Sequence, residues 1–107
     1  YTVFGRDGDV IEATFVKATG PVFGSQVVHP EVARTMRQML EMAAGPGGTA
    51  PRAQTMGYRV AGKTGTAQKY DAAVRGYGRG MYLASFAGIA PAASAYSSLV
   101  LTTFLPR

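Results

Sequence analysis

The run Lys63–Thr66, with the sequence KTGT, has the residue types and the spacing to bind a carboxylate. On an extended strand alternate side chains share a face, so Thr64 and Thr66 point to one side and Lys63 to the other. Two hydroxyl donors and a nearby ammonium can offset the cost of desolvating a carboxylate. Gly65 lacks the side chain that would hold another main chain away, so the strand could pair with an extended peptide. The run therefore predicts a strand on which a peptide ending in a carboxylate docks.

The alternative interpretation of the same run is an ordinary strand with a glycine bulge and no chemistry. The tripeptide lysine-threonine-glycine is short enough to arise by chance. The run by itself does not separate the two interpretations.

The rest of the sequence offers little support for any other kind of site. The chain has one histidine and no cysteine, so neither a thiolate nucleophile nor a metal site is predicted. That histidine, His29, precedes Pro30 at a predicted helix start, where we expect a capping or solvent-facing role. No serine has a lysine three residues further on, and the chain contains no asparagine. Asp7, Asp9 and Asp71 are isolated in predicted loops, which does not support paired-carboxylate catalysis.

The clearest predicted helix begins at Pro30 and ends at the glycine-proline pair 45–46. A proline suits the first helical position because its missing N–H would have no partner there. Arg37 and Glu41 are four residues apart and could pair on the solvent side of this helix. The apolar residues at helical spacing are expected to form its core face, and they are Val32, Met36, Met39, Leu40 and Ala43.

Three segments after this helix have the composition of strands, and they lie at residues 57–69, 81–90 and 97–105. A long glycine-containing loop that holds Tyr77 would join the first two, and the short PAASAY turn would join the last two. Antiparallel neighbours are then the simplest topology. The last segment would carry apolar side chains on both faces of a strand, so we expect it at the centre of the sheet. The predicted fold class is α+β, with one antiparallel sheet and one helix packed against it.

The first residues of the chain allow two interpretations. Asp7-Gly8 stands between two apolar stretches, which is a hairpin signal. Alternatively, a helix ends at Gly5 and a strand follows near residues 10–17.

The composition is that of a packed globular unit. Of 107 residues, 47% are hydrophobic and 16% are charged, which is unlike a disordered chain. The net charge is +5, but the basic residues are spread along the chain and form no run, so no nucleic-acid partner is expected. No apolar run approaches the roughly 20 residues that span a bilayer. We expect an excised segment, with any membrane anchor outside it.

Three longer stretches carry a family resemblance. They are PEVARTMRQMLEMAAGPGGTAP at 30–51, GYRVAGKTGTAQK at 57–69 and YLASFAGIAP at 82–91. In their order and spacing, nearly the whole chain resembles the C-terminal half of the transpeptidase domain of class B penicillin-binding proteins, especially the cell-division type. The resemblance implies the fold of penicillin-binding proteins and serine β-lactamases, with residues 1–107 forming an incomplete, C-terminal portion of the domain.

The same resemblance implies a peptidoglycan D,D-transpeptidase, which acylates its serine with the penultimate D-alanine of a stem peptide and passes the acyl group to an amine on a neighbouring stem. β-Lactams would acylate the same serine. Lys63 would help organise the charge network around that serine. Thr64 and Thr66 would hold the substrate carboxylate, and the main-chain N–H of Thr66 would be an oxyanion-hole donor. Gly65 would keep the groove open, and Tyr82 would form an aromatic wall, with a half-buried strand tyrosine as the alternative.

The family also needs an S-x-x-K and an S-x-N element, and this sequence has neither. The resemblance therefore implies that both precede Tyr1 and that this segment alone is inactive. It further implies a periplasmic domain of an inner-membrane-anchored protein without a cofactor. The implied partners are peptidoglycan stem peptides, β-lactam antibiotics and membrane proteins of the division machinery. A non-catalytic penicillin- or peptide-binding sensor domain shares the KTG element and stays an alternative, and a basic module for an anionic polymer is a third.

Overall fold

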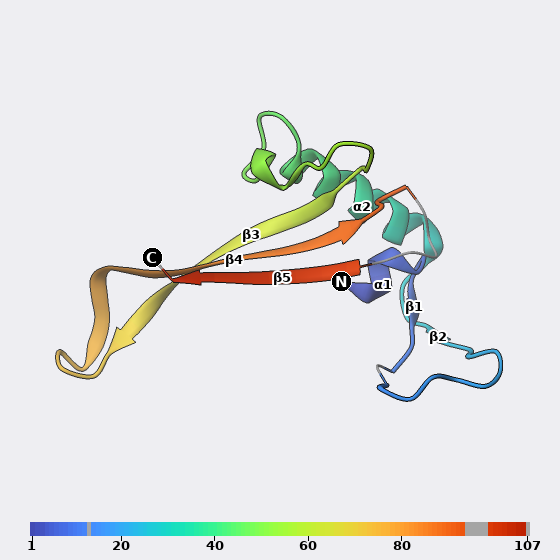
Figure 1. Cartoon of the computed structure of the whole chain (residues 1–107), viewed down its shortest axis with the longest axis horizontal. Coiled ribbons are helices and arrows are strands. Elements are labelled where there is room, and N and C mark those ends of the chain that lie inside the picture. Colours follow the sequence, from blue (N-terminus) through green and yellow to red (C-terminus); the bar gives the residue numbers. More distant parts are fainter. Residues whose placement is uncertain (13, 94–98, 107) are drawn as a thin grey trace.

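The chain folds as an antiparallel sheet with a helix packed at one end of it (Figure 1). The computed structural model describes residues 1–12, 14–93 and 99–106, and of residues 79 and 99–106 it describes the backbone. The elements in chain order are α1 (Thr2–Gly5), β1 (Asp9–Val10), β2 (Ser25–Gln26), α2 (Pro30–Ala44), the 3-10 turn η1 (Pro51–Ala53), β3 (Ala61–Asp71), β4 (Gly76–Ala90) and β5 (Leu99–Pro106). The predicted α+β class is confirmed.

The three long strands pair in the order β3-β4-β5, and both pairings are antiparallel. In the register of β3 with β4, Lys63 lies opposite Ala87 and Thr64 opposite Phe86. Strand β4 therefore lies between the other two. The prediction of a central last strand is wrong within this sheet, because consecutive strands pair as neighbours along the chain and this leaves β5 on the outer side of β4.

The connection between β3 and β4 is a tight hairpin and not the predicted long loop. Asp71 pairs with Gly76, so the turn spans only residues 72–75. A carboxylate oxygen of Asp71 accepts a hydrogen bond of 2.9 Å from the N–H of Ala73, which fixes the turn. Tyr77 is therefore a strand residue, and its ring meets that of Tyr70 edge-on with centroids 6.1 Å apart. This cross-strand aromatic pair stabilises a segment whose glycines suggested a loop.

Helix α2 begins at Pro30 and ends at Ala44, as the sequence predicts. His29 is its exposed N-cap residue, and its side chain makes no capping hydrogen bond. The predicted core face is confirmed at Leu40, Met36 and Ala43 are half-buried, and the prediction is wrong at Val32 and Met39. Val32 and Met39 are 52% and 57% exposed, and the residues that α2 buries are Ala33, Arg37, Leu40 and Ala44. Small alanines let the helix lie close to the sheet, which explains why this stripe packs inward.

The core forms where α2 meets the first residues of β3 and the end of β4 (Figure 1). Leu40 packs there with Ala61 and Ala92, and the half-buried Phe4 of α1 covers the cluster. The N–H of Ala92 donates to the carbonyl of Arg59 at 2.7 Å, so the chain after β4 is joined to the segment before β3. The part of the PAASAY turn at 94–96 lies outside the described residues.

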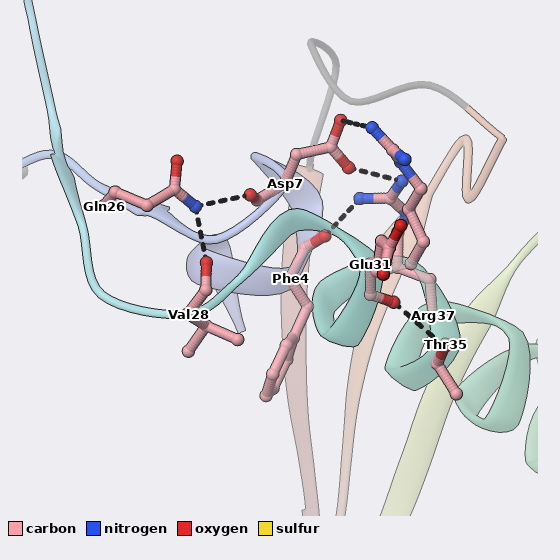
Figure 2. Close-up of polar contacts among 8 residues, drawn as sticks. Phe4, Asp7, Gln26, Val28, Glu31, Thr35 and Arg37 are labelled. Atoms are coloured by element: carbon pink, nitrogen blue, oxygen red, sulfur yellow. Dashed lines mark hydrogen bonds and ion pairs between the residues drawn. The ribbon is translucent and has the colours of Figure 1, made fainter.

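Arg37 points into the molecule from α2 and does not form the predicted pair with Glu41. Its guanidinium lies 2.7 Å from a carboxylate oxygen of Asp7 and also donates to the carbonyl of Phe4 (Figure 2). Glu41 instead pairs with Arg59. The physical reason is that a residue of the buried stripe needs a partner for its charge, and the turn after α1 supplies one.

The chain around Asp7 joins a helix to a strand. Asp7 and Gly8 have φ angles of 51° and 97°, in the left-handed region. The side-chain amide of Gln26 donates to the Asp7 carbonyl at 2.9 Å (Figure 2), and β1 pairs with β2. The hairpin interpretation of Asp7-Gly8 is therefore wrong, and the helix ending at Gly5 is confirmed. The strand that follows is shorter than predicted, because β1 covers only Asp9–Val10.

Candidate active-site strand

The KTGT run lies in the first half of β3, near the end of the sheet on which α2 packs (Figure 1). On one side β3 pairs with β4, and no strand of the described part of the chain pairs with its other edge. Lys63 and Thr66 are exposed, and Thr64 is half-buried. The run is thus accessible along an open strand edge.

The peptide groups of this run alternate between β4 and the open edge. The carbonyl of Gly65 accepts from the Ser85 hydroxyl of β4 at 3.3 Å, so this carbonyl faces β4. The carbonyl of Thr64 instead accepts from the Lys63 ammonium at 3.0 Å. Because the peptide groups of residues i and i+2 in a strand face the same side, the N–H and C=O of Thr66 face outward together with those of Thr64.

The Lys63 ammonium reaches round the strand edge to the hydroxyl face. Its Nζ atom lies 3.0 Å from the Thr64 carbonyl oxygen and 3.3 Å from Thr64 Oγ1. The side chains of Lys63 and Thr64 project from opposite faces of the strand, so this contact requires a long side chain that can pass around an open edge. The arrangement gathers one positive charge, the hydroxyls of Thr64 and Thr66 and outward peptide groups at a single edge. Such a set of donors suits an extended peptide with a terminal carboxylate.

Thr49 is a member of this group that the sequence did not reveal. The Thr64 hydroxyl donates to Thr49 Oγ1 at 3.1 Å. Thr49 belongs to the loop after α2, 15 residues earlier in the chain. A threonine in a glycine-rich loop has no periodic pattern, so only the folded chain brings it to the strand.

A side chain at Gly65 would project from the same face of the sheet as that of Ser85, with which Gly65 pairs. A Cβ atom at this position would lie 2.6 Å from Ser85 Oγ, which is closer than side chains approach one another. We expected the missing side chain to leave space for a ligand backbone; the nearest group in that direction is the native hydroxyl of Ser85. The glycine therefore also accommodates the neighbouring strand.

Tyr82 is half-buried and shares a face with the two threonines. Tyr82 lies opposite Gln68, and Thr66 lies opposite Ala84. On this face of the sheet, the pair that contains Tyr82 is therefore the next one after the pair that contains Thr66. The structure thus brings Lys63 and Thr64 into contact and places Thr66 and Tyr82 along the same face. Tyr77 stands further away, near the hairpin turn.

Two contacts fix the start of β3 to α2 and so hold the motif in place. Arg59 forms a fork with the Glu41 carboxylate, with Nε–Oε1 and Nη2–Oε2 distances of 2.5 and 2.6 Å. The hydrogen bonds that Arg59 donates to Glu41, together with the negative charge of that carboxylate, raise the pKa of Arg59 above its ordinary value. The Gln54 side chain donates to the carbonyl of Ala44 at 3.0 Å and to that of Val60 at 3.3 Å. The helix end and the strand start are therefore held together.

Two kinds of feature are absent from the part of the chain that the structure describes. No three side chains among its histidine, aspartates and glutamates gather as metal ligands would. None of its helices combines the length and the apolar character that crossing a bilayer requires.

Comparison with protein families places nearly the whole chain in one of them. Residues 1–103 match the model of the penicillin-binding protein transpeptidase domain. Over 107 residues the chain is 37% identical to the peptidoglycan D,D-transpeptidase FtsI of Escherichia coli K12, covering all of this chain and 18% of the relative. It is 44% identical to the penicillin-binding protein PbpB of Mycolicibacterium smegmatis, covering 86% of this chain and 17% of the relative.

Solved structures of similar sequence share the fold. The apo transpeptidase domain of penicillin-binding protein 3 from Burkholderia pseudomallei superposes with a TM-score of 0.84 at 38% identity, covering 97% of this chain and 31% of that one. Penicillin-binding protein 3 from Mycobacterium tuberculosis, solved with aztreonam, gives a TM-score of 0.74 at 30% identity, covering 98% and 27%. The chain spans about a sixth of the length of the curated relatives it matches.

Proposed function

The chain belongs to the penicillin-binding-protein transpeptidase family, and from that premise we propose that it is the C-terminal part of the transpeptidase domain of a cell-division type peptidoglycan D,D-transpeptidase. Residues 1–107 supply the KTG strand and one wall of the groove in which stem peptides are cross-linked. The observation that carries the proposal is the contact of the Lys63 ammonium with Thr64 at an open strand edge.

The substrate of this proposal is a stem peptide that ends in D-alanine. Its terminal carboxylate lies against the hydroxyls of Thr64 and Thr66, with the Lys63 ammonium as the opposite charge. Its main chain runs along β3 as an added strand and pairs with the outward peptide groups. Tyr82 lies along the same face and contacts the acyl side chain.

The chemistry is acyl transfer through a serine that lies outside these residues. The serine hydroxyl adds to the carbonyl of the penultimate D-alanine, and the terminal D-alanine leaves as its amine takes a proton. An amine of a neighbouring stem peptide then attacks the acyl-enzyme and releases the serine. The N–H of Thr66 donates to the oxyanion in both steps, and one such donor contributes about 3 to 4 kcal/mol in the transition state.

The same site accounts for inhibition by β-lactams, whose carboxylate and strained amide mimic the end of the stem peptide. Two solved structures of penicillin-binding protein 3 from Mycobacterium tuberculosis, one in complex with aztreonam and one with ampicillin, support this assignment. They share 30% and 33% sequence identity with this chain.

Residues 1–107 alone are inactive in this proposal. A carboxylate-binding site without a nucleophile and its general base cannot catalyse acyl transfer. The S-x-x-K and S-x-N elements that would supply these groups are absent from the sequence. The proposed parent protein carries both elements before Tyr1. It also carries a membrane anchor there, so that the domain lies in the periplasm beside membrane proteins of the division machinery.

The test uses the full-length parent protein. We expect a fluorescent penicillin to label it covalently, and we expect it to release D-alanine from a stem peptide while forming a cross-linked product with an acceptor amine. Labelling without any cross-linked product or D-alanine release would favour the alternative, a sensor domain that binds penicillin without turnover. Absence of labelling would overturn the proposal.

A further inference from the structure

Thr49 is a side chain outside β3 that contacts Thr64 of the KTGT run. The distance between Thr64 Oγ1 and Thr49 Oγ1 is 3.1 Å. Lys63 Nζ lies 3.3 Å from the same Thr64 oxygen. The three groups form a chain in which the ammonium donates to Thr64 and Thr64 donates to Thr49.

The loop that carries Thr49 is held firmly on the end of α2. The N–H groups of Thr49 and Ala50 both donate to the carbonyl of Ala43, at 2.9 and 3.3 Å. This close passage depends on Gly48, because a Cβ atom there would collide with the same carbonyl oxygen. The main chain of Thr49 is therefore held in place by these contacts, and its side chain reaches Thr64 from this fixed position.

The proton count at Thr64 gives Thr49 a role when a ligand arrives. An ammonium only donates and a carboxylate only accepts, whereas a hydroxyl has one proton and accepts through its lone pairs. With Thr64 as the donor to Thr49 in the free site, its single proton must turn to the carboxylate on binding. Thr49 has a hydroxyl proton of its own. Once the Thr64 proton has turned to the carboxylate, Thr49 can donate this proton to Thr64 Oγ1. Hydrogen bonds in such a chain strengthen one another.

We propose that Thr49 is a positioning residue for carboxylate recognition: its hydroxyl accepts from Thr64 in the free site and donates to Thr64 in the complex. This inference rests on the proposed function, because it requires Thr64 to bind a carboxylate. It adds to the site a residue from the α2–β3 loop, outside the KTG strand.

The test compares Thr49→Val and Thr49→Ser in the full-length parent protein. Valine keeps the β-branched shape and removes the hydroxyl, whereas serine keeps the hydroxyl. Thr55→Val is the matched control, because Thr55 is an exposed threonine of the same connection. The measured quantity is the second-order rate constant of acylation by benzylpenicillin and by its methyl ester, which lacks the free carboxylate.

We expect Thr49→Val to slow acylation by benzylpenicillin roughly three- to tenfold, the effect of one hydrogen bond, and to leave the methyl ester unaffected. Thr49→Ser should retain the wild-type preference for the free acid. Equal losses for both compounds would show a merely structural role and overturn the inference, as would unchanged rates in Thr49→Val. A wild-type protein that neither compound acylates would overturn the proposed function itself, and this inference with it.

Discussion

The Ser85 hydroxyl oxygen of β4 lies 2.6 Å from the point where a Cβ atom on Gly65 would stand, and it donates to the Gly65 carbonyl. The glycine of the KTG run and this serine therefore constrain each other. We predict that Gly65→Ala lowers the free energy of unfolding by about 1 kcal/mol, because the serine hydroxyl must rotate away and lose its hydrogen bond. Denaturant unfolding of the transpeptidase domain measures this change.

A double-mutant cycle provides the control for that prediction. In a Ser85→Ala background this hydrogen bond is already absent, so Gly65→Ala should lower the free energy of unfolding by little more. Additive effects of the two substitutions would contradict the direct contact.

Lys63 is the charged group of the candidate site, and its removal tests the site directly. We predict that Lys63→Ala slows acylation of the full-length protein by penicillin on the order of a hundredfold or more, with the fold intact, as expected for loss of a group in the proton-transfer and charge network. Lys69→Ala, on the same strand, is the matched control and should label normally. Unchanged labelling of Lys63→Ala would defeat the role given to this lysine.

Arg37 and Arg34 approach the same carboxylate from neighbouring turns of α2, which allows a matched comparison. Arg37 is 7% exposed and lies 2.7 Å from Asp7, whereas the Arg34 side chain is 57% exposed and lies 3.8 Å away. We predict that Arg37→Met destabilises the domain by about 3 kcal/mol, since it removes one partner of a largely buried pair. Arg34→Met should cost about 0.5 kcal/mol or less. Similar melting temperatures for the two variants would contradict this prediction.

The fork between Arg59 and Glu41 leads to a prediction about pH. Glu41 raises the pKa of Arg59, so between neutral pH and the ordinary pKa of arginine the fork contributes its full stabilisation, and this contribution is lost as the pH rises through the raised value. We therefore predict that the melting temperature of Arg59→Gln lies below that of the wild type by the same interval at about pH 7 and about pH 10. Added salt should narrow the interval, because the arginine is exposed. An interval that shrinks between these two pH values would contradict the assignment.

Local signals in the sequence were sufficient for the elements that carry the site. Helix α2 starts at Pro30 and ends before the glycine after Ala44, and both signals are visible in the sequence. The valine- and threonine-containing stretch around Lys63 predicts β3. These features depend on neighbours in the chain, as capping and strand propensity do. The order of the elements and the placement of KTGT in a strand followed from them, whereas its position near the start of β3 did not.

Several features that the sequence did not predict depend on distant partners. Arg37 is buried because Phe4, 33 residues away, offers a carbonyl, and a helical pattern does not report such a partner. The buried stripe of α2 keeps the predicted Leu40 but otherwise lies one residue further along, because Ala33 and Ala44 pack against neighbouring elements. Likewise, Thr49 joins the site only because Gly48 lets its loop pass over the Ala43 carbonyl.

The outward peptide groups of β3 have a consequence for how inhibitors and their targets change over time. A substitution can replace a side chain, but every amino acid except proline retains the same main-chain N–H and C=O. Under the proposed function, an antibiotic held mainly by the backbone beside Thr64 and Thr66 makes contacts that a substitution removes directly only if it introduces proline. Other substitutions could weaken these contacts only by displacing the strand, and the register with β4 opposes such a displacement.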